Sequence, residues 1–190
     1  LPLREVRCGL AEIVKTAALF DADLFNTLHS RAPSLCAVTP PAFEDIVSRC
    51  CQWKAHIVAE DEREHGRRAL LNYGHTFGHA LETLGGYTAL NHGEAVAIGM
   101  GMAADLTELL GLAEPGLAHT QDELLRTLDL PTHLLDTDIS AEKVLTVMSK
   151  KKKVQSSRLR LILLRGIADP HIAEAPPEEA VLKAIGGRLG

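Results

Sequence analysis

The strongest constraint on the fold is the segment of residues 95–104, which carries only small or apolar side chains. It reads Ala-Val-Ala-Ile-Gly-Met-Gly-Met-Ala-Ala. A helix that is apolar on all sides has to be buried by other elements, and small residues let those elements approach closely. The segment is too short and too rich in glycine to predict a membrane span. We therefore predict a central buried helix over residues 92–110.

Apolar residues at helical spacing predict that most of the remaining chain is helical too. Helices are expected at about residues 4–20, 23–30, 41–62, 67–84, 114–128 and 140–149, and a last one opens at residues 176–179. Asp21 and Asp23 are candidate caps for the second helix, and Pro33 is expected in the loop after it. Alternating and then apolar residues predict a short β-hairpin near residues 158–174. The expected fold class is mainly α, a single multihelical domain over residues 1–190.

Composition and charge argue against several classes of protein. The 190 residues suffice for one domain with a sizeable core, and a formal net charge of −5 gives no reason to expect nucleic acid or an anionic membrane as a partner. No apolar run is long enough to span a membrane, and no signal-peptide pattern opens the chain. The four cysteines form no C-x-x-C pair. We therefore expect small buried thiols, a reducing compartment and a cytoplasmic protein.

Three histidines suggest a metal site. His75 and His79 are four residues apart and so share one face of a helix, and His92 follows a glycine break. Spacing alone nominates the first two as a ligand pair, with Glu12, Glu82 and Glu94 as carboxylates that could complete the set. Three protein ligands with an open fourth position are the usual arrangement of catalytic zinc. The alternative is that these histidines are packed or capping residues.

Basic side chains accompany the histidines. Lys15 follows Glu12 by three residues and shares its helix face, and Arg68 and Asn72 are spaced to fall on the face of His75. Cations beside a metal site favour an anionic substrate, held through carboxylate or phosphate oxygens. The acidic residues 60–64 are either a solvated turn or a group that positions Arg68 or Lys54 by salt bridges. No G-x-S-x-G elbow and no phosphate-binding G-x-x-x-x-G-K-[ST] loop is present.

Several blocks of the sequence, taken in order, resemble one known family. They are residues 8–15, Lys54 with residues 57–64, residues 68–82 and residues 92–100, followed more weakly by residues 152–153 and 159–161. The chain resembles the C-terminal, metal-binding domain of the 3-dehydroquinate synthase family, within the sugar-phosphate cyclases.

The resemblance implies a set of site residues. The implied ligands of Zn²⁺ or Co²⁺ are Glu12, His75 and His92; the implied catalytic residues are Lys15, Lys54 and His79; the implied substrate-binding residues are Glu64, Arg68, Asn72 and Lys152. His79 is thereby moved from the metal to the substrate pocket. The implied reaction converts 3-deoxy-D-arabino-heptulosonate 7-phosphate to 3-dehydroquinate and phosphate, with NAD as cofactor, in the shikimate pathway.

The resemblance also implies partners outside this chain. In the family, NAD is bound mainly by an N-terminal α/β domain, and this chain has no G-x-G-x-x-G loop. The chain begins at Leu1 without a leader, so we expect a piece of a longer, homodimeric enzyme that is inactive by itself. The sequence departs from the family pattern at Thr16, Lys151 and Ser157, where tyrosine, aspartate and glycine are common.

Three alternatives remain open at this point. The first is another sugar-phosphate cyclase, one that makes an aminated quinate or a cyclitol; residues 77–79 with Asn72 favour the dehydroquinate branch. The second is a metal-dependent polyol dehydrogenase, which would not need so many cationic groups. The third is a helical module that binds zinc structurally, but such a site is normally closed by four ligands.

Overall fold

The computed structural model describes residues 1–37, 43–61, 66–86, 90–135, 138–153 and 158–190, without the side chains of residues 151–153. Its α-helices are α1 (Leu3–Phe20), α2 (Ala22–Cys36), α3 (Glu44–Glu60), α4 (His75–Leu84), α5 (His92–Leu109), α6 (Leu117–Thr127), α7 (Ala141–Lys153) and α8 (Glu178–Gly186). A 3₁₀ helix, η2 (Arg67–Asn72), precedes α4, and strands β1 (Arg160–Gly166) and β2 (Asp169–Glu174) form an antiparallel hairpin. The predicted fold class, mainly helical with one hairpin, is confirmed.

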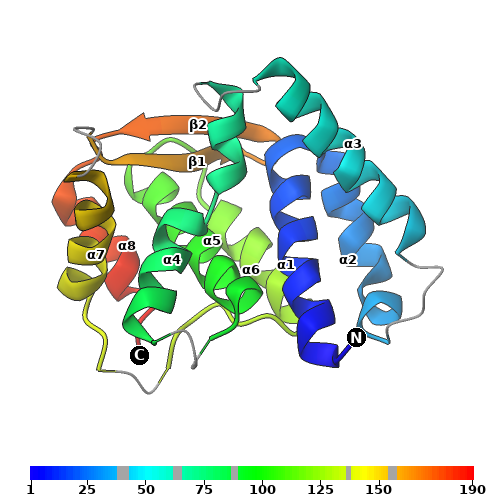
Figure 1. Ribbon diagram of the computed structural model, residues 1–190, viewed down its shortest axis with the longest axis horizontal. Coiled ribbons are helices and arrows are strands. Elements are labelled where there is room, and N and C mark those ends of the chain that lie inside the picture. Colours follow the sequence, from blue (N-terminus) through cyan, green and yellow to red (C-terminus); the bar gives the residue numbers. More distant parts are fainter. Residues whose placement is uncertain (38–42, 62–65, 87–89, 136–137, 154–157) are drawn as a thin grey trace.

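Helix α5 is the centre of the structure. Residues 95–104 are all buried, as predicted, and α5 contacts α1, α4, α6, α8 and β1. The helices α1, α2 and α3 lie on one side of it and α7 and α8 on the other, while the hairpin crosses one end (Figure 1). Within the described residues, no helix combines the length and the apolar character that a membrane crossing requires. The small side chains of α5 thus serve close helix packing.

The start of α5 is fixed by sequence-local hydrogen bonds. Asn91 caps the helix by accepting from the backbone N–H of Glu94 at 2.9 Å, and the Glu94 carboxylate accepts from the Asn91 N–H at 2.9 Å. This reciprocal pair satisfies N–H groups that the first helical turn leaves without partners. Gly93 then lies directly against α1, where a Cβ would come within 2.4 Å of the Cα of Cys8. The contact sets the start of α5 close to α1, one turn before Glu12.

The predicted helix over residues 67–84 is wrong in one respect, because the structure divides it. Gly74 has a φ of +75° and separates η2 from α4. Its position leaves no room for a side chain, since a Cβ would lie 2.8 Å from the Val96 carbonyl oxygen. A left-handed residue in so tight a contact favours glycine. Arg68 and Asn72 therefore do not share one continuous helical face with His75.

Helix α2 is longer than predicted. It runs to Cys36 and includes Pro33, which we had expected in a loop. Leu28, Ala32 and Leu35 are fully buried at helical spacing, so the continued apolar face outweighs the hydrogen bond that proline cannot donate. The predicted cap of this helix is confirmed, because the Asp21 carboxylate accepts from the Leu24 N–H at 2.9 Å. Helix α7 also extends past the predicted end, to Lys153.

Candidate metal centre and substrate cavity

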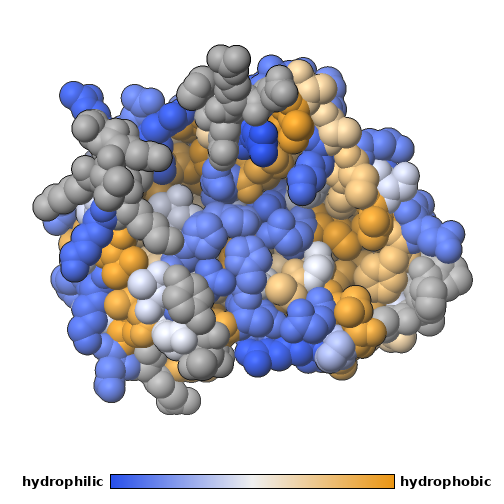
Figure 2. All heavy atoms as spheres, in the orientation of Figure 1, coloured by the Kyte–Doolittle hydropathy of each residue, from blue (hydrophilic) through white to orange (hydrophobic). Residues whose placement is uncertain are grey.

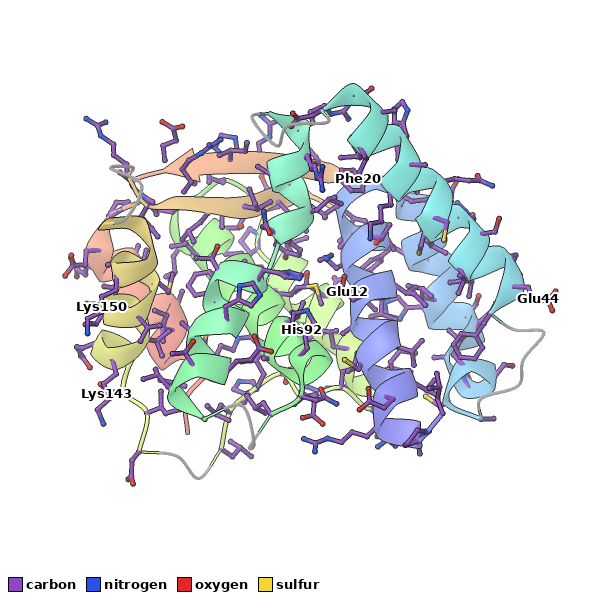
Figure 3. The ribbon with its side chains drawn as sticks, viewed as in Figure 1. Glu12, Phe20, Glu44, His92, Lys143 and Lys150 are labelled. Carbon is purple, nitrogen blue, oxygen red and sulfur yellow. The ribbon has the colours of Figure 1, made fainter. Side chains whose placement is uncertain are left out.

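Glu12, His75 and His92 come together from three helices, and the ligand set predicted from the family resemblance is thus adjacent in space. The Oε1 atom of Glu12 on α1 lies 3.5 Å from the Nε2 of His75 on α4 and 3.8 Å from the Nε2 of His92 on α5. Figure 3 shows Glu12 and His92 facing each other in the middle of the molecule. One donor atom from each residue lies within 4.8 Å of the others.

The rings of His75 and His92 each have a hydrogen-bond partner at Nδ1, the nitrogen farther from Glu12. These partners determine the tautomer of each ring. The Nδ1 of His75 lies 3.1 Å from the backbone carbonyl of Tyr73, which can only accept, so Nδ1 carries the proton and Nε2 the lone pair. The Nδ1 of His92 likewise lies 3.2 Å from a carboxylate oxygen of Glu82. Both Nε2 lone pairs therefore point toward Glu12.

These three acceptors fit a divalent cation. The Oε1 of Glu12 is buried and has no hydrogen-bond partner in the described part of the chain, and acceptors that face one another repel unless a cation lies between them. Two ligand atoms at the usual ~2.1 Å from a tetrahedral zinc ion are roughly 3.4 Å apart. The observed 3.5 and 3.8 Å match that spacing.

In a second possible donor set, His79, Glu82 and His92, one donor atom from each residue also lies within 4.8 Å of the others. It fits a cation less well, because Glu82 already accepts from His92 and a metal there would leave the Oε1 of Glu12 without a partner. His79 lies beside the first set, with ring centroids 5.4 Å from His75 and 5.9 Å from His92. The geometry thus favours Glu12 over His79 as the third ligand and revises the pair that spacing alone nominated.

Lys15 lies against the metal set. Its Nζ donates to the other oxygen of Glu12, Oε2, at 2.6 Å, and only 7 % of its side chain is exposed. Burial lowers the pKa of Lys15, and burial together with Lys15 lowers the pKa of His75 to about 4, so His75 is neutral at pH 7. Burial opposes ionisation of Glu12, but Lys15 and the two histidines outweigh it and hold its pKa below the usual range. The electrostatics therefore keep the Glu12 carboxylate facing a neutral His75, the protonation states that metal binding needs.

A cavity of about 560 Å³ opens beside these residues. The predicted site residues that line it are Glu12, Lys15, Lys54, Arg68, Asn72 and His75. Arg68 is placed by Asp61, whose carboxylate accepts from the backbone N–H of Arg68 at 3.0 Å. Glu60 pairs instead with Arg67, at 2.7 Å. The acidic run therefore positions Arg68 at least through its backbone, by way of Asp61.

Several lining residues have no counterpart in the sequence-based prediction. They are Gly9, Ile13, Thr16, Val47, Cys50, Cys51 and Leu71. The expectation of buried cysteines is wrong, because Cys51 is exposed and the other three are partly so. Burial nevertheless raises the pKa of Cys50 to about 11, which keeps it a neutral thiol. Helix α3 thus contributes apolar and thiol side chains to the cavity wall as well as the cation Lys54.

Two predicted substrate residues cannot be placed in the cavity. Glu64 lies outside the described residues, and Lys152 lies in α7 with its side chain outside the description. The neighbouring Lys150 is on the opposite side of the molecule from α3 (Figure 3). Figure 2 shows hydrophilic residues across the middle of the same face, with hydrophobic residues over the α1 and α3 side. The described cationic groups of the site therefore come from α1, α3 and η2.

Comparisons with known proteins give matches over most of the chain. Residues 9–154 match the family model described as 3-dehydroquinate synthase C-terminal. Curated proteins named 3-dehydroquinate synthase are 44% identical in Xanthomonas oryzae pv. oryzae (98% of this chain, 52% of the relative) and 39% identical in Synechocystis (98% and 52%). The chain thus spans about half the length of the curated relatives it matches.

Solved structures of cyclases share the fold. The 2-epi-5-epi-valiolone synthase of Streptomyces hygroscopicus, solved with NAD⁺ and Zn²⁺ bound, superposes with a TM-score of 0.86 at 28% identity, covering 97% of this chain and 51% of that one. A 2-deoxy-scyllo-inosose synthase complexed with carbaglucose-6-phosphate, NAD⁺ and Co²⁺ superposes with a TM-score of 0.81 at 24% identity, over 100% and 54%. On the family match, the chain belongs to the 3-dehydroquinate synthase family and corresponds to its C-terminal region.

Proposed function

We propose that this chain is the metal- and substrate-binding half of a 3-dehydroquinate synthase. The proposed reaction converts 3-deoxy-D-arabino-heptulosonate 7-phosphate to 3-dehydroquinate and phosphate. The observation that carries the proposal is the convergence of three unshared lone pairs, from Glu12, His75 and His92, at the edge of a cavity lined by cationic groups. A sugar phosphate that also carries a carboxylate is the class of ligand that such a cavity would bind.

Each group of residues has a proposed task. When bound by Glu12, His75 and His92, a divalent ion such as Zn²⁺ or Co²⁺ supplies Lewis-acid polarisation of a substrate oxygen. Lys54, Arg68 and Asn72 bind the anionic groups and hold the substrate in one orientation, which lowers the entropic part of the barrier. Lys15 fixes Glu12 and stabilises negative charge that develops nearby. His79, Glu64 and Lys152 remain proposed contacts of the substrate.

We further propose that NAD is bound mainly by an N-terminal region that the relatives have beyond the half that this chain spans. The complete enzyme would be a cytoplasmic homodimer, and the 190 residues alone would not turn over. NAD would oxidise a ring hydroxyl transiently, phosphate would leave, and re-reduction, ring opening and aldol closure would follow. The residues of this chain would bind and orient the sugar throughout.

A second candidate function is that of another sugar-phosphate cyclase. The similarity in fold to the valiolone synthase favours it, with a TM-score of 0.86. Identity is lower there, at 28%, than to the relatives named 3-dehydroquinate synthase, at 39–44%. Substrate choice separates the two candidates.

A chimera tests the proposal. The chain replaces the matching half of the Xanthomonas oryzae relative, and phosphate release is measured with NAD⁺, Zn²⁺ and either 3-deoxy-D-arabino-heptulosonate 7-phosphate or other sugar phosphates. We expect turnover of the former, loss of turnover in His92→Ala with helical content unchanged, and no effect of His119→Ala, which removes an exposed histidine. Turnover of another sugar phosphate alone would establish the second candidate. Unfolding of His92→Ala would instead indicate a structural metal.

A further inference from the structure

Glu82 is a buried carboxylate that has no role in the proposed reaction as described above. It follows His75 and His79 on α4 at helical spacing and so extends the face that carries both histidines. Only 11 % of its side chain is exposed, and a carboxylate so buried is costly unless it is paired. One of its oxygens, Oε1, lies 3.2 Å from the Nδ1 of His92.

His92 needs such a partner more than His75 does. It is the first residue of α5, and 41 % of its side chain is exposed, compared with 13 % for His75. Packing alone therefore restrains its ring weakly. The ring of His75 is held by the Tyr73 backbone carbonyl, at 3.1 Å. For His92, a side chain has to hold the ring in the same way.

The other carboxylate near the start of α5 is committed elsewhere. Glu94 accepts from the Asn91 N–H at 2.9 Å and pairs with Arg4 at 2.6 and 2.9 Å. Its two oxygens are thereby used in capping α5 and in fixing the α1 end. Glu82, from a different helix, is the carboxylate that the structure places on His92.

We propose that Glu82 is a positioning residue for the metal ligand His92. It accepts from Nδ1–H, which selects the tautomer whose Nε2 lone pair faces Glu12, and it fixes the plane of the ring. The inference rests on the proposed metal site, and it assigns the two histidines different kinds of support. A backbone carbonyl, which no substitution removes, orients His75, whereas the side chain of Glu82, which a substitution can replace, orients His92. Substitutions at position 82 should therefore change the orientation of the His92 ring and with it the affinity for the metal.

The competing role for Glu82 is that of a ligand, in the set with His79 and His92. The two roles make opposite demands on one proton. A positioning Glu82 requires hydrogen on the Nδ1 of His92, whereas a ligand Glu82 places the metal at that nitrogen and excludes the proton. The proton therefore reports which role is correct.

Zn²⁺ affinity is the first measurement, by competition with a chromophoric chelator on the 190-residue chain. We expect Glu82→Leu to weaken binding by about 10–100-fold, the usual effect of losing such a partner. Glu82→Gln should lose less, because its amide oxygen still accepts from Nδ1–H, and Glu12→Gln should lose most. The matched control is Glu123→Gln on α6, an exposed residue whose side chain lies outside both sites. Glu82→Leu and Glu123→Gln binding Zn²⁺ equally would overturn the inference.

Proton NMR and visible spectra of the Co²⁺-loaded chain are the second measurement. A purely structural role of Glu82 would leave the exchange of the His92 Nδ1 proton unchanged. Wild type should show two metal-shifted exchangeable proton signals, from the Nδ1–H groups of His75 and His92. Glu82→Gln should keep the visible ligand-field spectrum while one of the two protons exchanges faster with water. A ligand-field change in Glu82→Gln, with affinity loss in His79→Ala as large as in Glu12→Gln, would make Glu82 a ligand instead. Failure of wild type to bind Zn²⁺ or Co²⁺ would refute the proposed metal site itself, which is a separate outcome.

Discussion

Two polar clusters touch α5, one near each end, and their charged groups are compensated in different ways. Near its start, Glu12, His75 and His92 turn three acceptors toward one point. Near its end, Arg188 donates to Asp105 at 2.5 and 2.7 Å and to Asp122 at 2.6 Å. The second cluster carries its own cation, whereas the first leaves a gap that fits one.

The difference separates a structural cluster from a binding one. Arg188 is 3 % exposed and also donates to the Thr132 carbonyl at 3.2 Å. Next to it, the buried atoms without a partner in the described residues are the amide nitrogen of Gln121 and one oxygen of Asp122, a donor and an acceptor. Those two kinds of atom complement each other, whereas the first cluster gathers acceptors only. A cluster of one kind of group points to a ligand from outside.

The largest expected effect is the loss of Arg188. Arg188→Met removes the cation that binds both Asp105 and Asp122, and leaves Asp122 with the more exposed Arg126 at 3.0 Å. Removing one partner of a buried ion pair typically costs about 3–5 kcal/mol. Urea unfolding followed by circular dichroism measures the loss. Arg165→Met is the matched control, since Arg165 and Asp169 form a pair on the surface, with 52 and 53 % of their side chains exposed. We expect it to cost about 0–1 kcal/mol, and equal losses in the two variants would remove the contrast between the clusters.

The next effect concerns the cluster of Glu12, His75 and His92. Here the test adds a cation, whereas the test at Arg188 removes one. Zn²⁺ at about 100 times its dissociation constant should raise the free energy of unfolding by about 2.7 kcal/mol. Glu12→Gln should lose this stabilisation, and the metal-free chain should also become less stable, because the buried Lys15 loses its carboxylate partner. Denaturant curves with and without Zn²⁺ measure both quantities. A gain in stability with Zn²⁺ that is as large in Glu12→Gln as in wild type would show that Glu12 does not bind the cation.

Glycines of α5 give the third test, because each cluster has one beside it. A Cβ at Gly99 would lie 2.2 Å from the Gly74 carbonyl oxygen, while a Cβ at Gly101 would lie 2.9 Å from the Arg188 guanidinium. Backbone yields less than the end of a side chain, so we expect Gly99→Ala to cost about 1–3 kcal/mol and to weaken Zn²⁺ binding by separating α4 from α5. Gly101→Ala should leave Zn²⁺ binding unchanged. Gly186→Ala, with nothing within 4 Å, is the control; the idea fails if all three bind Zn²⁺ equally.

The sequence predicts features that depend on residues close together in the chain. The burial of residues 95–104, the cap at Asp21 and the hairpin follow from local patterns, and the structure confirms them. The break at Gly74 does not follow, because its cause is a contact with Val96 and Met100 of another helix. The local sequence pattern therefore predicts one continuous helix across Gly74, whereas tertiary packing ends the helix there.

The two clusters differ in the same respect. Histidines and a carboxylate in a family pattern nominate the metal set from sequence, although their roles as ligands stay a prediction. The Arg188 cluster leaves no comparable pattern, since its partners Asp105 and Asp122 are 83 and 66 residues away. The same holds for Glu82, whose contact with His92 depends on how α4 meets α5.

The smallest expected effect is at Asp21, a buried carboxylate whose cationic partner, Arg49, is more exposed than Arg188. Burial opposes its charge, but hydrogen bonds from Trp53, Leu24 and Arg49 outweigh that and hold its pKa below the usual value. A carboxyl whose pKa is depressed by folding stabilises the chain above its unfolded pKa of about 3.9 and loses that contribution as pH falls through the folded pKa. Asp21→Asn keeps the helix cap and should cost about 1 kcal/mol at pH 7. Unfolding curves between pH 7 and pH 2 should show the two chains converging only below about pH 4, whereas a difference that persists into strong acid would mean that the charge of Asp21 contributes nothing.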